Sequence, residues 1–169
     1  TFVRQARLRV SEGQFFKELL RDRGKTIGRL DSRFTASDEV DTGGGPESDA
    51  AEQNSPAFVS CLNDYFTREL NYITDQRYRT YGGGRFEFAE GRYADTSDDL
   101  RQALRDNPHL KVLITCGYYD LACPYFGIQF NVNHMGLRRE QLSNISYQYY
   151  HAGHMMYIDA KERAKLAND

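Results

Sequence analysis

The regular alternation of helix and strand patterns after residue 96 constrains the fold of this chain more than any other feature. The patterns run in the order helix, strand, helix, strand, helix, over 97–107, 110–116, 124–136, 145–149 and 160–167. This order is typical of an α/β sheet with parallel strands. The strand at 110–116 is mostly apolar and rich in branched side chains, which indicates burial on both of its faces. The sequence therefore predicts an α/β fold.

Local signals support two of these helices in more detail. Leu100, Ala103 and Leu104 are predicted to form the buried stripe of the first helix. Asp159 and Glu162 have the spacing of a capping box at the start of the last helix.

Two strands alone would make a poor sheet, because both outer edges would lack hydrogen-bond partners. We therefore expect the chain to form part of a larger parallel sheet flanked by helices. A second copy of the chain could also supply a neighbour for the open edge of 110–116, which would give a homodimer.

The first half of the chain is polar and irregular. A helix is expected just after Ser11, with Gly24 as its stop, and 26–30 could be a short strand. Residues 36–56 are rich in glycine and polar residues, which predicts a flexible loop. A second helix is expected over 56–72.

Charge and hydropathy exclude two classes of partner. The net charge is -2, whereas binding to a phosphate backbone would need a clear basic excess. No apolar run is long enough to span a bilayer, and no signal peptide stands at the start of the chain. We therefore expect neither nucleic acid nor a membrane as a partner.

Cysteine usage gives no sign of a metal site. Three cysteines are present, Cys61, Cys116 and Cys123, so they cannot all pair internally. None of them has the Cys/His spacing of a zinc site. Buried or free thiols are expected, and no metal.

Two residues with catalytic potential follow the two predicted strands. Asp120 comes after the strand at 110–116, and His154 after the strand at 145–149. Adjacent parallel strands would bring both residues to the same rim of the sheet, where active residues of open α/β sheets lie. An aspartate there can fix the histidine tautomer, so that the other ring nitrogen takes a proton from a hydroxyl nucleophile. The order acid, then histidine, is that of α/β-hydrolases.

The motifs around these residues resemble one family. The segment 117–124, with the pattern Gly-x-x-Asp-x-x-Cys, resembles the acid loop of serine carboxypeptidases, and 153–155 (Gly-His-Met) resembles their histidine loop. Residues 63–65 (Asn-Asp-Tyr) resemble the start of a helix upstream of these loops. The resemblance covers most of 56–158, and the sequence Ala-Gly-His-Met-Met-Tyr is similar to the bacterial branch of the family.

This resemblance implies the C-terminal portion of an α/β-hydrolase fold, with a partial parallel sheet flanked by helices and a helical cap segment. Residues 56–169 would be the C-terminal part of the catalytic domain. Residues 1–55 would be the helical cap segment, which includes the flexible loop 36–56. Members of the family generally work in secretory, vacuolar, extracellular or periplasmic settings.

The resemblance also implies roles for single residues. Asp120 would be the acid of a Ser-Asp-His triad and His154 its general base. Cys123 and Met155 would lie beside the substrate pocket. The activity implied is that of a serine-type carboxypeptidase, a protease that hydrolyses C-terminal residues from peptide substrates without a metal or cofactor.

The nucleophile of the family is absent from the sequence. It lies in a Gly-x-Ser-x-Gly elbow, and neither Ser32 nor Ser60 has the flanking glycines. The serine would belong to an N-terminal half outside this sequence, which would then be a partner of the chain, and the chain alone should be inactive. Two alternatives stay open: a catalytically incomplete structural fragment, and an esterase or acyltransferase of the same fold.

Overall fold

The structure is a computed structural model that describes residues 10–38, 44–46, 48–76, 78–80 and 95–169. The chain divides into two compact units, one made of Thr1–Ala51 with Asp95–Asp169 and the other of Glu52–Ala94. Segments from both ends of the sequence therefore fold together in the first unit. The predicted division between 55 and 56 differs from this arrangement, because it assigns these two segments to separate domains.

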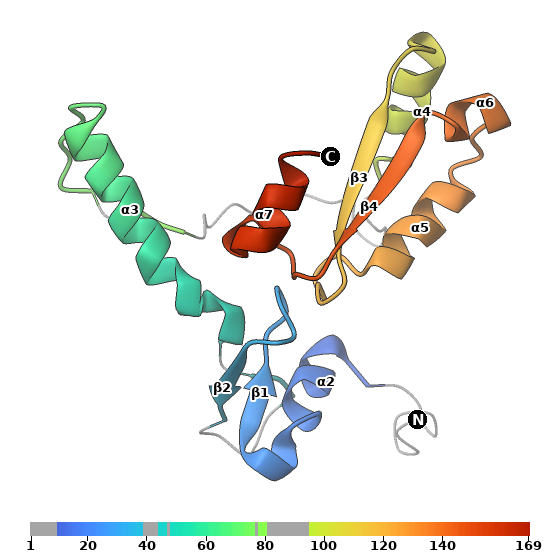
Figure 1. The fold of residues 1–169 in the computed structure, drawn as a ribbon. Coiled ribbons are helices and arrows are strands. Elements are labelled where there is room, and N and C mark those ends of the chain that lie inside the picture. The colour runs from blue at the N-terminus through green and yellow to red at the C-terminus, as the bar shows by residue number, and fades with distance from the viewer. Residues whose placement is uncertain (1–9, 39–43, 47, 77, 81–94) are drawn as a thin grey trace. The chain divides into compact units, whose positions relative to one another are not determined.

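The described chain contains helices, 3-10 turns and two short pairs of strands (Figure 1). Their bounds are α2 (Glu12–Glu18), the 3-10 helix η1 (Arg21–Arg23), β1 (Lys25–Ile27), β2 (Thr35–Ser37), the 3-10 helix η2 (Ala50–Asn54), α3 (Ser55–Arg68), α4 (Ser97–Asp106), β3 (Val112–Gly117), α5 (Tyr125–His134), α6 (Arg139–Leu142), β4 (Ile145–Tyr150), the 3-10 helix η3 (Met156–Ile158) and α7 (Ala160–Leu166). These mixed helices and small sheets confirm the α/β class.

The strands β3 and β4 form the sheet that positions the candidate site. They pair in parallel over their whole length, with Val112 opposite Ile145 and Gly117 opposite Tyr150. The connection between them carries α5 and α6 (Figure 1), as parallel pairing of consecutive strands requires a crossover. Both strands and their parallel arrangement are as predicted, with small shifts at their ends.

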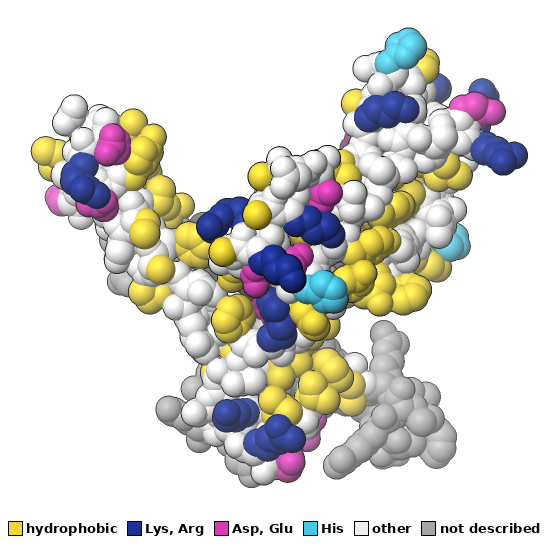
Figure 2. All heavy atoms as spheres, viewed as in Figure 1, with side chains coloured by type: hydrophobic (Ala, Val, Ile, Leu, Met, Phe, Trp, Pro, Cys, Tyr) yellow, Lys and Arg dark blue, Asp and Glu magenta, His cyan; other side chains and the backbone are white. Residues whose placement is uncertain are grey.

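The prediction that the strand at 110–116 is buried on both faces is wrong. Leu113 is 45% exposed, and in β3 only Cys116 and Gly117 are buried. The physical reason is that burial on both faces requires helices packed on each face, and the described elements leave Leu113 uncovered. In the described part of the chain β3 and β4 also pair only with each other, so both outer edges of the sheet are open. Hydrophobic side chains also lie at the surface over β4 and α5 (Figure 2).

A small hydrophobic core lies beyond the end of β4. Tyr150, Ala152 and Met156 are buried there, and Leu166 of α7 packs against them. The Tyr150 hydroxyl donates a hydrogen bond to Asp169 at 2.8 Å. The loop that follows β4 is therefore held between the strand and the last helix.

The predicted capping box of the last helix is only half formed. The Asp159 side chain accepts hydrogen bonds from the backbone N–H groups of Lys161 and Glu162, as an N-cap should. The buried Glu162 carboxylate instead accepts a hydrogen bond from the backbone N–H of His151, at 3.0 Å. This bond ties α7 to the loop after β4.

The segment at the start of the described chain forms a helix and a hairpin. Ser11 caps α2 with a capping box, as the predicted helix requires. The buried side chains of Lys17 and Asp38 form an ion pair of 3.0 Å. β1 and β2 pair antiparallel, so the strand predicted at 26–30 is confirmed as far as Ile27.

The prediction of a flexible loop over 36–56 is wrong for much of its second half. Residues in η2 form a helical turn with two buried alanines. The Asp49 carboxylate accepts hydrogen bonds from the backbone N–H groups of Arg29 and Leu30, at 3.0 and 3.2 Å. The polar Asp49 side chain therefore binds backbone N–H groups instead of being fully solvated. Outside the described residues lie 39–43 and 47.

Two predicted helices differ from expectation in their burial. Of the stripe predicted for α4, only Leu104 is buried, while Ala103 is exposed. α3 ends at Arg68, earlier than predicted, and 63–65 lie inside it rather than at its start. None of the α3 side chains is buried. No helix in the described ranges is long and apolar enough to cross a membrane.

The buried Tyr150 should make stability depend on alkaline pH. Burial, with the hydrogen bond to Asp169, raises the pKa of Tyr150 from 10.0 to about 12. Because the folded state holds this proton more tightly than the unfolded state, the stabilisation is complete below about pH 10 and is lost as pH rises towards about 12. Tyr150→Phe should remove this part of the alkaline decline in the free energy of unfolding, measured by urea titration at several pH values.

The matched control is Tyr157→Phe, because Tyr157 is 46% exposed. That variant should keep the alkaline decline of the parent chain. An equal decline in Tyr150→Phe and in the parent chain would contradict the prediction.

Candidate active site

The loops that follow β3 and β4 continue side by side beyond the ends of the strands. The backbone N–H of Tyr118 donates to the carbonyl of Tyr150 at 2.9 Å, and that of Tyr119 to the carbonyl of Ala152 at 3.0 Å. This extension carries the parallel register into the acid loop, which contains Asp120, and into the histidine loop. The two loops therefore meet at the carboxyl edge of the sheet, as predicted.

Asp120 and His154 form a hydrogen-bonded pair at this edge. The His154 Nδ1 atom lies 2.9 Å from Asp120 Oδ2. A carboxylate oxygen can only accept here, so Nδ1 carries the proton of the neutral ring and Nε2 keeps its lone pair. Within the described ranges Nε2 has no hydrogen-bond partner, and the His154 side chain is 44% exposed. The arrangement leaves a base that an outside group can reach.

The backbone of the acid loop holds the Asp120 carboxylate in place. Its Oδ1 atom accepts hydrogen bonds from the backbone N–H groups of Ala122 and Cys123, at 2.8 and 2.9 Å. The Asp120 side chain is only 6% exposed. With Oδ2 bonded to His154, both oxygens have partners, so the carboxylate has a fixed orientation towards the imidazole.

Two glycines allow the loops to come this close. An added Cβ at Gly117 would lie 2.6 Å from the carbonyl oxygen of Ala152 and against that of Gly153. An added Cβ at Gly153 would lie 2.5 Å from the Cβ of Asp31 and against the carbonyl oxygen of Leu30. Any larger residue at these positions would push backbone away from backbone.

Cys123 lies next to the Asp120–His154 pair, but its thiol is not poised to act as a nucleophile. Partial burial and the neighbouring charge of Asp120 raise the pKa of the Cys123 thiol, and the thiolate is the reactive form. Met155 is half-buried beside His154. The predicted places of Cys123 and Met155 beside a substrate pocket stay predictions.

The structure brings together a group of potential metal ligands that the sequence spacing did not indicate. One ligand atom each of Asp120, Cys123 and His154 lie within 4.8 Å of one another. Both carboxylate oxygens of Asp120 already accept hydrogen bonds, and the raised pKa of the Cys123 thiol opposes the thiolate that a metal needs. This set fits a proton-transfer pair better than a metal centre.

A third segment, 29–33, contacts both loops, and the sequence analysis did not assign it to the site. The backbone N–H of His154 donates to the carbonyl of Leu30 at 2.7 Å. That of Ser32 donates to Tyr119 at 2.9 Å. Asp31 is 3% exposed, and its carboxylate binds the Arg33 guanidinium. No periodicity or motif spacing signals these contacts, because they join residues that are far apart in sequence.

The serines considered in the sequence do not complete the pair. Ser32 lies beside the acid loop, yet no hydrogen bond joins its hydroxyl to the His154 ring among the described residues. Ser60 belongs to α3, which is in the other compact unit. Neither serine is therefore placed as a nucleophile for His154.

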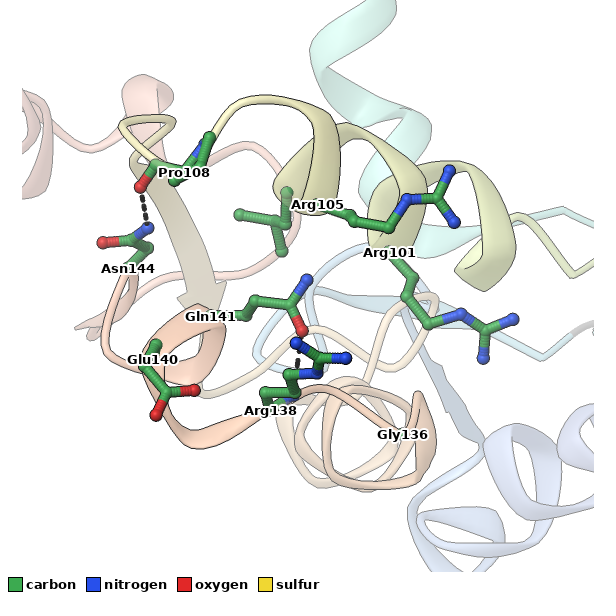
Figure 3. Close-up of a pocket in the computed structure, with 9 residues that line it drawn as sticks. Arg101, Arg105, Pro108, Gly136, Arg138, Glu140, Gln141 and Asn144 are labelled. Atoms are coloured by element: carbon green, nitrogen blue, oxygen red, sulfur yellow. Dashed lines mark hydrogen bonds between the residues drawn. The ribbon is translucent and has the colours of Figure 1, made fainter.

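A hollow at the other end of the sheet does not adjoin this pair. A cavity of about 480 Å³ lies between α4, α6 and the starts of the strands (Figure 3). It is lined by Arg101, by Pro108 before β3 and by Asn144 before β4. Strands of this length span about 20 Å, and Asp120 and His154 follow their opposite ends. The cavity is therefore separate from the Asp–His site.

Comparison with known proteins identifies no relative. No family model matches the chain, and no curated protein or solved structure matches it either. The resemblance of the two loops to those of serine carboxypeptidases therefore stays a prediction that depends on their motifs.

Substitution of the two glycines should separate the acid loop from the histidine loop. We expect Gly117→Ala and Gly153→Ala each to lower the free energy of unfolding by about 1–3 kcal/mol, as overpacking against backbone does. Urea unfolding measures this change.

The matched control is Gly127→Ala in α5, where an added Cβ meets nothing within 4 Å. Alanine in an open helical position should raise the free energy of unfolding by about 0.5–1 kcal/mol. If both loop variants kept the parent free energy of unfolding, this would contradict the close backbone approach at Gly117 and Gly153.

Proposed function

We propose that this chain supplies the acid, Asp120, and the general base, His154, of a serine-type carboxypeptidase with an α/β-hydrolase fold. The observation that supports the proposal is the 2.9 Å hydrogen bond between them at the carboxyl edge of two parallel strands. The motifs of the acid and histidine loops supply the choice of carboxypeptidase among the enzymes that use such a pair.

The position of the His154 ring suits the proton transfers that accompany acyl transfer to a serine. His154 Nε2 would take the proton of a serine hydroxyl as the serine oxygen attacks the carbonyl carbon of the last peptide bond. The imidazolium that forms would be stabilised by the Asp120 carboxylate. It would then give its proton to the leaving amine, and a water molecule would release the acyl group by the same steps in reverse order.

The proposal places the serine nucleophile outside this sequence. In support, His154 Nε2 has no hydroxyl partner among the described residues, and both edges of the β3–β4 sheet are open there. A serine-bearing N-terminal half would extend the sheet and cover exposed apolar side chains such as Leu113. Without it, a second copy of the chain is the proposed neighbour, and size-exclusion chromatography would then detect a dimer.

The test uses the full protein that contains both this chain and the serine-bearing half. His154→Ala and Asp120→Asn should each lower kcat for a blocked dipeptide by about 10⁴-fold, the loss typical of a triad without its base or its correct tautomer. The control is His134→Ala, since His134 is exposed at the end of α5 and stacks on Phe130. Equal activity of His154→Ala and His134→Ala would contradict the proposal.

The same assay separates a peptidase from an esterase or acyltransferase of the same fold. A carboxypeptidase should release the C-terminal amino acid of the blocked dipeptide. Hydrolysis of the matching ester alone, with the peptide left intact, would overturn the substrate class.

A labelling experiment tests the position of the nucleophile. A fluorophosphonate probe should label the full protein but not the 169-residue chain, because the reactive serine would lie elsewhere. Ser32→Ala should leave labelling of the full protein unchanged. Loss of labelling in that variant would identify Ser32 as the nucleophile and contradict the proposed location of the serine.

A further inference from the structure

The segment 29–33 forms a third backbone partner of the catalytic loops. The backbone N–H of Leu121, directly after the catalytic acid, donates to the carbonyl of Arg29 at 3.0 Å. On the other side of the site, the backbone N–H of His154 donates to the carbonyl of Leu30 at 2.7 Å. The segment thus binds both loops, and one of these bonds is made by the histidine itself.

One guanidinium group connects the segment to both loops. Arg33 donates through Nε to Asp31 Oδ1 at 3.0 Å and through NH2 to Asp31 Oδ2 at 2.7 Å, a two-point ion pair. Its remaining NH1 group donates to the carbonyl of His151 at 2.9 Å. The same guanidinium lies 4.5 Å from the centroid of the Tyr119 ring. Only a planar, fork-shaped cation can make all of these contacts together.

The acid of this ion pair is buried, while the Arg33 side chain is 42% exposed. The Asp31 side chain is 5% exposed, and its Oδ1 also accepts from the backbone N–H of Arg33 at 3.0 Å. The hydrogen bond to Asp31 raises the pKa of Arg33, so the guanidinium stays charged. The absence of a side chain at Gly153 lets the histidine loop lie directly against Leu30 and Asp31.

We propose that the Asp31–Arg33 ion pair positions the catalytic base, by holding residues 151–154, which follow β4, against the acid loop. This inference rests on the proposed function of His154. Arg33 touches neither the Asp120 carboxylate nor the His154 ring in the described hydrogen bonds, so it is a positioning residue rather than a catalytic one. It acts through the carbonyl of His151 and the ring of Tyr119.

The first test replaces Arg33 in the full protein. Arg33→Met should lower kcat for the blocked dipeptide about a hundred-fold, the effect of a displacement near 1 Å in a catalytic group, with little change in KM. The control, Arg105→Met, removes an ion pair at the other end of the sheet whose partners, Arg105 and Asp106, are 68% and 58% exposed. That variant should keep the parent kcat.

A second pair of variants separates positioning from stability. Arg33→Lys keeps a positive charge beside Asp31 but cannot make the fork, so it should fold and still lower kcat. The double variant Asp31→Asn with Arg33→Met removes the unpaired buried charge and should recover stability relative to Arg33→Met. Because it lacks the bond to the His151 carbonyl, its kcat should stay low. A double variant that recovers both stability and kcat would reduce the pair to a structural role and overturn the inference.

A spectroscopic measurement tests the position of the ring without reference to activity. Nitrogen-15 NMR of labelled histidine reports how much of the His154 ring is protonated at Nδ1. Arg33→Met and Arg33→Lys should lower the Nδ1–H population, whereas Arg105→Met should leave it unchanged. An unchanged His154 spectrum and kcat in Arg33→Lys would overturn the inference, while activity insensitive to His154→Ala would overturn the proposed function itself.

Discussion

The hydrogen bond between Asp120 and His154 depends on the parallel register of β3 and β4. Gly117 lies opposite Tyr150 at the ends of the two strands, so both loops begin at the same level of the sheet. A shift of one residue in this register would turn the side chains of the shifted strand to the other face of the sheet. It would also move one loop along the other. The backbone bonds from Tyr118 to Tyr150 and from Tyr119 to Ala152 extend the register as far as Asp120.

This dependence explains which parts of the site could be predicted from the sequence. The strands, their parallel order and the meeting of Asp120 with His154 follow from local patterns and from one general rule about the edges of α/β sheets. The contributions of Asp31 and Arg33 could not be predicted in this way. Only Ser32 separates them in the chain, but their partners Tyr119 and His151 are distant in sequence, and only the tertiary fold brings these groups together.

The errors in the predicted fold share a cause. The apolar composition of β3 indicated burial on both faces, yet Leu113 is exposed beside an open sheet edge. An apolar composition is typical of a strand in a larger parallel sheet, where helices cover both faces. A two-stranded parallel sheet does not have this cover. The polar loop around Asp49 gave the opposite error, because its carboxylate binds the backbone of Arg29 and Leu30 instead of solvent.

The buried Asp31 carboxylate is best understood through its effect on geometry. Removing the Asp31 carboxylate from water costs several kcal/mol, whereas the Arg33 side chain stays 42% exposed. Hydrophobic residues of similar volume often stabilise a protein as well as a buried charge with its partner, or better. An apolar pair at these positions could fill the same space, but it could not bind the His151 carbonyl and lie over the Tyr119 ring at the same time. The ion pair therefore contributes a specific arrangement of the two loops, and that arrangement keeps the His154 ring within hydrogen-bond distance of Asp120.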